Sequence, residues 1–154
     1  MKVKVERTPK TEGIKYALPQ VNFTDTFSTT NHLDSLSIIS KLVFGTMPKW
    51  VGFLMKIRNN IVKVFGLKTE KPEDYHPEFK VGGYVGFFQI FSIQHNEIIL
   101  GADDKHLNFR VSIYNSNENQ FNIKVTTLVE YNNRFGKIYM FIVKPFHHFI
   151  VKKW

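Results

Sequence analysis

The stretch GADDKHLNFRVSIY, residues 101–114, places carboxylates, a histidine and an arginine close together in the sequence. A carboxylate beside an imidazole raises the basicity of the ring, which suits proton transfer. Asp104 and His106 are therefore the candidate catalytic pair, at the mouth of any cavity that this segment borders. The favoured alternative is an ordinary hairpin turn, because Asp side chains in turns accept hydrogen bonds from backbone N–H groups. Whether the chain is an enzyme stays open.

The strand predicted after this turn decides which side chains could reach a ligand. Alternate residues of a strand share a face, so Phe109 and Ile113 are expected to face the core, with His106 and Arg110 on the other side. An exposed ion pair of Arg110 with Glu130 would contribute about 0–1 kcal/mol. A one-residue slip or a bulge would turn Arg110 inward, where it could anchor a ligand carboxylate or phosphate.

Metal and cofactor chemistry finds little support in the residue pattern. His147 and His148 are adjacent on a predicted helix and point about 100° apart, whereas helical metal ligands need a spacing of three or four residues. The chain has no cysteine, so thiolate nucleophiles and Cys-based zinc sites are excluded. Dinucleotide-binding, P-loop, nucleophile-elbow and zincin motifs do not occur. We predict no metal and no cofactor.

Composition limits the partners. The net charge of +8 over 154 residues allows anionic partners, but the basic residues are interspersed with acids. No nucleic acid is expected, because there is no concentrated basic face and no recognisable module. No secretory signal follows the basic N-terminus, and the C-terminal apolar run stops at Lys144, short of the ~20 residues that span a bilayer. A cytoplasmic location fits these features.

The first half of the chain combines one strand with two helices. Residues 21–29 alternate as a half-buried strand does. Asn31 resembles a helix N-cap, and apolar residues then recur at helical spacing until Gly45. A second helix is predicted from Pro48, which suits a first-turn position, to Gly66.

Lysines recur at every seventh position of this second predicted helix, as Lys49, Lys56 and Lys63, beside Trp50 and Phe53. A helix with lysines on one side and large apolar groups on another can lie in a membrane interface. The favoured interpretation is a surface helix on its own core. Weak contact with an anionic membrane remains the alternative.

The second half is predicted to be strands followed by one helix. After a charged exposed loop, 68–84, come the runs VGFFQIFSI, EIIL, LNFRVSIY and QFNIKVTTLVEY, whose short polar links are typical of antiparallel hairpins. Asn132 or Asn133 is placed to cap the long apolar C-terminal helix. Pro145 should kink it and free the carbonyl of Phe141, either for a ligand or to follow the curvature of the sheet.

Segregated strands and helices define an α+β fold. We expect a curved antiparallel sheet wrapped around the C-terminal helix, with two short helices between the first and second strands. Residues 1–154 form one domain, of which 1–17 show no defined element. Its oligomeric state is not indicated by the sequence.

A family resemblance is carried by the segments PKWVGFLMKIRN, LGADDKHLNFR, VTTLVEYNNRFGKIYM and VKPFH, in this order. From about Leu18 to the end, the chain resembles a bacterial family of unknown function in the helix-grip superfamily. That superfamily also contains START lipid-transfer domains, polyketide cyclases and pollen-allergen-like binders. The resemblance implies a cavity between the sheet and the C-terminal helix that accepts an apolar or amphipathic small molecule.

The leading functional hypothesis is therefore binding of such a molecule, driven by burial of apolar area at about 25 cal/mol per Å². A cyclase or isomerase using Asp104 and His106, and a peripheral membrane or interaction module, are the alternatives. A core filled by the 15 Phe would remove the basis for a cavity. The residues predicted to line the cavity are Phe87, Phe91, Phe109, Ile113, Val125, Tyr139 and Phe146.

Overall fold

The computed structural model describes residues 3–45, 78–85, 88–103 and 107–153. The strands are β1 (Lys4–Glu6), β2 (Phe23–Thr29), β3 (Tyr84–Val85), β4 (Phe88–Ile93), β5 (Glu97–Asp103), β6 (Leu107–Asn115) and β7 (Ile123–Tyr131). The helices are α1 (Glu12–Ala17), α2 (Leu36–Gly45) and α4 (Arg134–Lys153). The described strands form one antiparallel sheet and the helices lie outside it, which confirms the α+β prediction.

One seven-stranded sheet, in the order β1-β2-β7-β6-β5-β4-β3, organises the molecule. All neighbouring strands are antiparallel, as the short polar links predict. The first and last long strands, β2 and β7, pair along their whole length, from Phe23 opposite Val129 to Thr29 opposite Ile123. β2 and β7 are therefore neighbours in the sheet although they lie far apart in the sequence.

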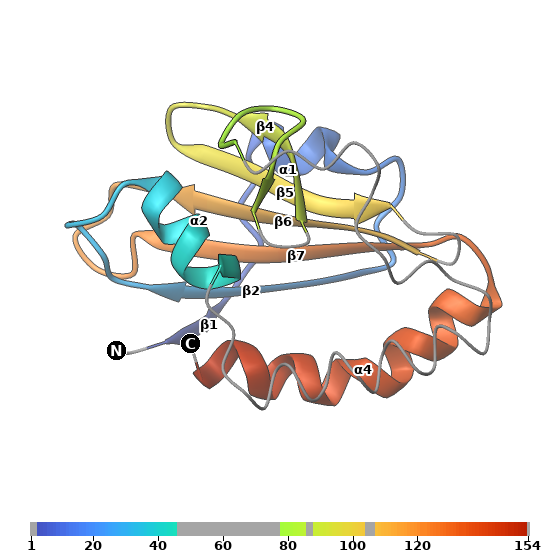
Figure 1. Ribbon diagram of the computed structural model, residues 1–154. Coiled ribbons are helices and arrows are strands. Elements are labelled where there is room, and N and C mark those ends of the chain that lie inside the picture. Colours follow the sequence, from blue (N-terminus) through green and yellow to red (C-terminus); the bar gives the residue numbers. More distant parts are fainter. Residues whose placement is uncertain (1–2, 46–77, 86–87, 104–106, 154) are drawn as a thin grey trace.

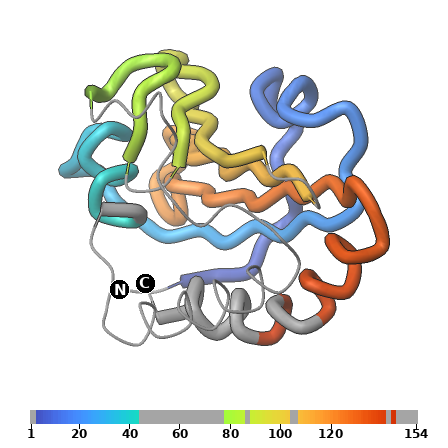
Figure 2. Tube along the Cα trace, turned by 45° about the vertical axis from the view of Figure 1, so that its right-hand side comes forward, coloured from blue at the N-terminus to red at the C-terminus, as the bar shows by residue number. Residues whose placement is uncertain are grey.

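The two faces of the sheet carry different side chains. We call inner the face that bears Ile98, Val111, Ile113 and Val125, which are neighbours in register, and outer the opposite face. Helices α2 and α4 pack on the inner face, whereas α1 contacts β5 and β6 from the outer side. Figures 1 and 2 show α1 on the side of the sheet away from α4.

The apolar core on the inner face has two parts. A large α2 cluster lies where α2 covers the sheet, and a smaller α4 cluster lies at the opposite end of β6, where α4 begins. The α2 cluster contains Ile39, Val85, Ile90, Ile98, Leu100, Val111, Ile113 and Ile123. The α4 cluster contains Leu107, Val129 and Met140, with Phe23, Phe109, Tyr131 and Tyr139 packed against it.

The helix starts follow capping chemistry. Asn133 Oδ1 accepts a hydrogen bond from the Gly136 N–H at the start of α4, so Asn133 is the cap between the two predicted candidates. Asn31 instead forms a turn upstream of α2, because its Oδ1 accepts from the N–H groups of Leu33 and Asp34. The helix predicted to follow Asn31 is α2, and it begins at Leu36, later than predicted. The predicted second helix lies outside the described residues.

Three local features differ from the sequence prediction. Residues 1–17 were left without an element, yet they contain β1 and α1. The run VGFFQIFSI is divided into β3 and β4, which pair with each other, with Val85 opposite Phe88. A register shift between Ile90 and Ser92 interrupts the pairing of β4 with β5, and a bulge of this kind changes the face of the residue between them.

Candidate functional site

The predicted cavity residues divide between the two faces of the sheet. Phe109, Ile113 and Val125 lie on the inner face. Ile113 is completely buried, whereas Phe109 and Val125 are only half-buried. Tyr139, also half-buried, packs on the α4 cluster. The side chains of Phe87 and Phe146, like Asp104 and His106, lie outside the described part of the structure, as do those of His147 and His148.

Phe91 is the predicted lining residue that takes a different position. The bulge in β4 places it on the outer face, where its ring lies 3.7 Å from the guanidinium carbon of Arg110. Arg110 is 8% exposed, and its Nη1 donates to Asp103 Oδ1 over 2.7 Å. Arg110 lies on the outer face, opposite to the apolar residues of β6, but it is buried there between Asp103 and Phe91 and not exposed to solvent as predicted. The proposed inward anchor for an anionic ligand is thus absent from the inner face described here.

An acidic residue that the sequence analysis did not single out lies on the inner face. Asp25 of β2 faces the same way as Phe23 and Phe27, opposite Thr127 of β7. Both of its carboxyl oxygens are inaccessible to solvent. Burial of a carboxyl group is costly unless other groups compensate for it, and Asp25 together with Thr127 gives this part of the inner face a polar character.

A second buried carboxyl group lies on the outer face beneath α1. Glu97 is 1% exposed. Its Oε2 accepts hydrogen bonds from Thr11 Oγ1 (2.6 Å) and Ser112 Oγ (2.7 Å). Gly13 of α1 lies so close that a Cβ there would be 1.8 Å from Glu97 Oε1. This arrangement attaches α1 to the sheet.

An ion cluster ties β1 to β7 on the outer face. Lys124 donates to Glu6 and also pairs with Glu118 at 2.9 Å. Burial alone would lower the pKa of Lys124, but the hydrogen bonds and charges of the two glutamates outweigh it and raise that pKa. Burial likewise opposes, but does not prevent, a lowering of the Glu6 pKa by Lys124 and Ser28. These shifts describe a structural ion cluster.

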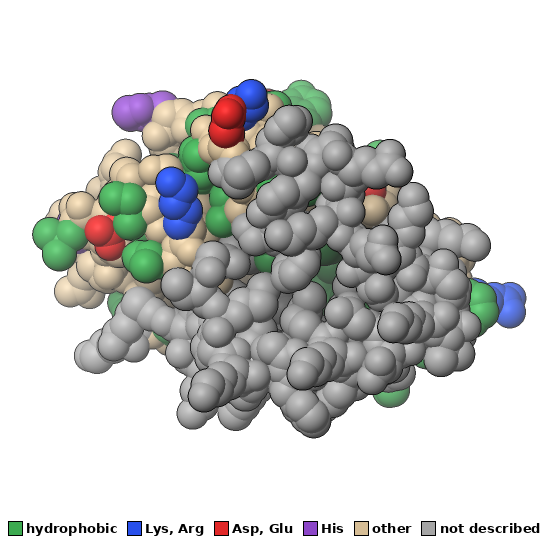
Figure 3. Space-filling view, viewed as in Figure 1, with side chains coloured by type: hydrophobic (Ala, Val, Ile, Leu, Met, Phe, Trp, Pro, Cys, Tyr) green, Lys and Arg blue, Asp and Glu red, His purple; other side chains and the backbone are tan. Residues whose placement is uncertain are grey.

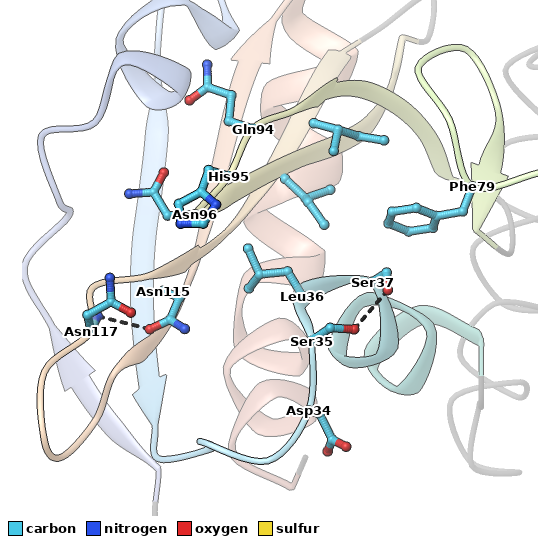
Figure 4. Close-up of a pocket in the computed structure, with 12 residues that line it drawn as sticks. Asp34, Ser35, Leu36, Ser37, Phe79, Gln94, His95, Asn96, Asn115 and Asn117 are labelled. Atoms are coloured by element: carbon cyan, nitrogen blue, oxygen red, sulfur yellow. Dashed lines mark hydrogen bonds between the residues drawn. The ribbon is translucent and has the colours of Figure 1, made fainter.

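A pocket of about 420 Å³ lies at the α2 end of the sheet, within the size range of small-molecule sites. Leu36, Phe79, Ile93 and Ile98 give it an apolar floor. The polar rim comes from the start of α2 (Asp34, Ser35, Ser37), the β4–β5 turn (Gln94, His95, Asn96) and the β6–β7 turn (Asn115, Asn117). Figure 4 shows Phe79 projecting into it from one side, with the asparagines on the other.

Hydrogen bonds between turns hold the rim together. Asn122, which is fully buried, donates to the Asn31 carbonyl (2.9 Å) and to Asn115 Oδ1 (3.1 Å), and its Oδ1 accepts from the Asn31 N–H. The Asn115 N–H donates to the Asn96 carbonyl. The turn before α2 and both hairpin turns are thereby fixed relative to one another.

From the sequence alone, HN and NSNEN are predicted to be polar links and Asn31 a helix cap, and none of them is predicted to form a site. The signal available was the repeated asparagine in NH, HN and NSNEN. Nothing in the sequence shows that segments so far apart meet, because the pairing register of the strands brings them together. Arg110 is not among the residues that line this pocket.

The described residues define an α+β protein built on one antiparallel sheet, with two buried carboxyl groups and a polar-rimmed pocket. Residues 17–154 match DUF2867, a family of proteins of unknown function, and the chain belongs to this family. The expectation of a family without an assigned function is thereby confirmed. No curated protein and no solved structure matches the chain. Within the described ranges, no helix is long and apolar enough to span a membrane.

Proposed function

We propose that the chain binds an apolar or amphipathic small molecule on the inner face of its sheet, in the manner of helix-grip proteins. Three features of the topology support this. Helix α2 follows β2, a meander of strands returns β7 to the side of β2, and α4 then begins against the inner face. An antiparallel sheet needs such a cover on its apolar face, and a ligand can share that face with the helices.

The observation that carries the proposal is the incomplete burial of large side chains on the inner face. Phe23, Phe88, Phe109 and Tyr139 all pack against the two clusters but are only partly buried. The rings of Phe88 and Phe109 meet edge to face, 5.3 Å apart between centroids. Aromatic side chains that pack on a core yet keep accessible surface offer apolar area that a ligand can remove from water.

The test starts with native mass spectrometry of the purified protein and organic extraction of whatever it releases. A titration with the amphipathic, anionic fluorophore 1-anilinonaphthalene-8-sulfonate then locates the site. Phe109→Ala and Phe91→Ala are a matched pair, because both phenylalanines are half-buried on neighbouring parts of the same sheet but face opposite ways.

We expect Phe109→Ala to weaken binding of the fluorophore by about tenfold, given the apolar area of one ring, and Phe91→Ala to leave it within about twofold. Thermal unfolding of both variants controls for loss of the fold. Equal binding by wild type and both variants, or a larger effect at Phe91, would place the site elsewhere and refute the proposal.

A further inference from the structure

The pocket at the α2 end is continuous with the inner-face wall. Ile98, in its floor, is a member of the α2 cluster, and Leu36 and Phe79 pack against that cluster. A molecule whose apolar part lies on the inner face could therefore place its other end among the polar rim groups. The chemistry of the rim then determines which end group fits.

The rim offers amide groups that are not used within the described structure. The side chains of Asn96 and Asn117, and the Nδ2 group of Asn115, make no hydrogen bond to another described residue, whereas Asn115 Oδ1 is occupied by Asn117 and Asn122. Ser35 and Ser37 share a hydrogen bond of 2.9 Å at the start of α2. Amides and hydroxyls both donate and accept, so they complement a ligand group that does the same.

Fixed charge is scarce in the pocket. None of the described lining residues is Lys or Arg. The acid, Asp34, points away from the other labelled side chains in Figure 4, and its Oδ2 accepts from Asn31 Nδ2. Lys41 holds its Nζ 5.6 Å from the ring centroid of Phe79 but does not line the pocket. The positive net charge of the chain is thus not concentrated here.

We infer that this pocket binds the uncharged, hydroxyl-bearing head group of the amphipathic ligand, such as a sugar or glycerol group. The inference rests on the proposed function, because it assumes that the apolar part of the ligand occupies the inner face. Asparagine side chains bridge neighbouring hydroxyls, and the ring of Phe79 supplies an apolar surface for the carbon skeleton. An anionic head group would find no Lys or Arg among the lining residues, and a cationic one would find only the Asp34 carboxylate, which Asn31 Nδ2 already engages.

Three probes that share a decyl chain test the head group: decyl glucoside, decanoate and decyltrimethylammonium, each titrated below its micelle concentration by calorimetry. We expect the glucoside to bind about tenfold more tightly than either ion, since two or three net hydrogen bonds suffice for that ratio. Asn96→Ala should weaken the glucoside about fivefold and leave decanoate within about twofold. The control is Asn119→Ala, an exposed asparagine of the β6–β7 turn outside the lining.

The outcomes separate the two proposals. Binding of all three probes that depends on Phe109 but not on Asn96 would keep the inner-face site and refute the uncharged head group. Tighter binding of decanoate that is lost in Lys41→Gln would assign an anionic head group and likewise overturn the inference. Failure of every probe to bind in a Phe109-dependent way would refute the proposed function itself.

Discussion

Glu97 and Gly13 show how one close contact can fix a whole element. The Glu97 carboxyl group is buried against the Gly13 backbone and held by two hydroxyl groups, so it has little freedom to move aside. A side chain at position 13 would have to displace it or lift α1 from the sheet. The glycine is required here by close approach, and not by its backbone conformation.

Gly13→Ala is expected to lower the free energy of unfolding by about 2 kcal/mol, as overpacking does. Helix propensity alone would favour alanine by about 1 kcal/mol, so the sign of the measured change identifies the contact. When Gly13→Ala is introduced into a Glu97→Ala variant, unfolding by denaturant should show a smaller loss in the free energy of unfolding. An equal loss in both backgrounds would mean that another neighbour is responsible.

The ion cluster around Lys124 predicts a dependence of stability on pH. The pKa of Glu6 lies below its ordinary value of 4.5, so its contribution is present above that pH and is lost as the pH falls through the folded-state pKa. Between about pH 5 and 3, the free energy of unfolding should therefore fall less in Lys124→Met than in the wild type.

Unfolding by urea across this pH range measures the effect, and Lys15→Met is the control because it removes the same charge from an exposed position. At neutral pH, Lys124→Met should cost about 2 kcal/mol, the value of hydrogen bonds to charged groups. Parallel pH profiles for wild type and Lys124→Met would show that Glu6 is not stabilised by Lys124.

For a single residue, the sequence pattern predicts the face of the sheet on which the side chain lies. It does not predict the residue with which that side chain interacts. Alternation correctly put Arg110 and Glu130 on the outer face. Their predicted pairing did not form, because Arg110 lies opposite Gly101 and reaches Asp103 on β5, while Glu130 bonds to Asn108 and the Gln20 N–H. Partners depend on register between strands, which alternation within one strand does not contain.

Among the elements, α4 provides the sharpest test of a local signal. Asn133→Ala should lower the free energy of unfolding by about 1 kcal/mol, because the first turn of α4 loses its cap. Asn132 is the matched control: its Nδ2 donates to Asn108 Oδ1 in an exposed position, so Asn132→Ala should cost less than about 0.5 kcal/mol. Chemical denaturation of the two variants compares them, and the reverse order would reassign the cap.

Long periodic elements were predictable and short or irregular ones were not. The strands β6 and β7 follow their alternating patterns, β5 follows its short apolar run, and α4 follows its apolar run and its cap. β1 and α1 have three and six residues, too few for a period to be recognised. The bulge in β4 places Phe91 on the outer face, and the residue pattern of this strand does not predict a bulge.

For the molecule as a whole, the pairing of β2 with β7 determines how folding proceeds. Thr26 and Thr126 hydrogen-bond across this pair, 2.9 Å apart but 100 positions apart in the sequence. Loop closure over such distances is slow. We expect refolding, followed by stopped-flow fluorescence, to take milliseconds to seconds, about the range of β-rich domains. Refolding completed within microseconds would contradict this expectation.

The short strand β1 affects the tendency of the chain to aggregate. It covers β2, with Val5 opposite Phe27, and it lies outside the part of the chain that matches the family, residues 17–154. A chain trimmed to begin at residue 17 would present β2 as a bare edge, and bare edges recruit strands from other molecules. We therefore expect β1 to reduce aggregation by covering the edge of β2. Light scattering should show more aggregation for the trimmed chain than for the full chain.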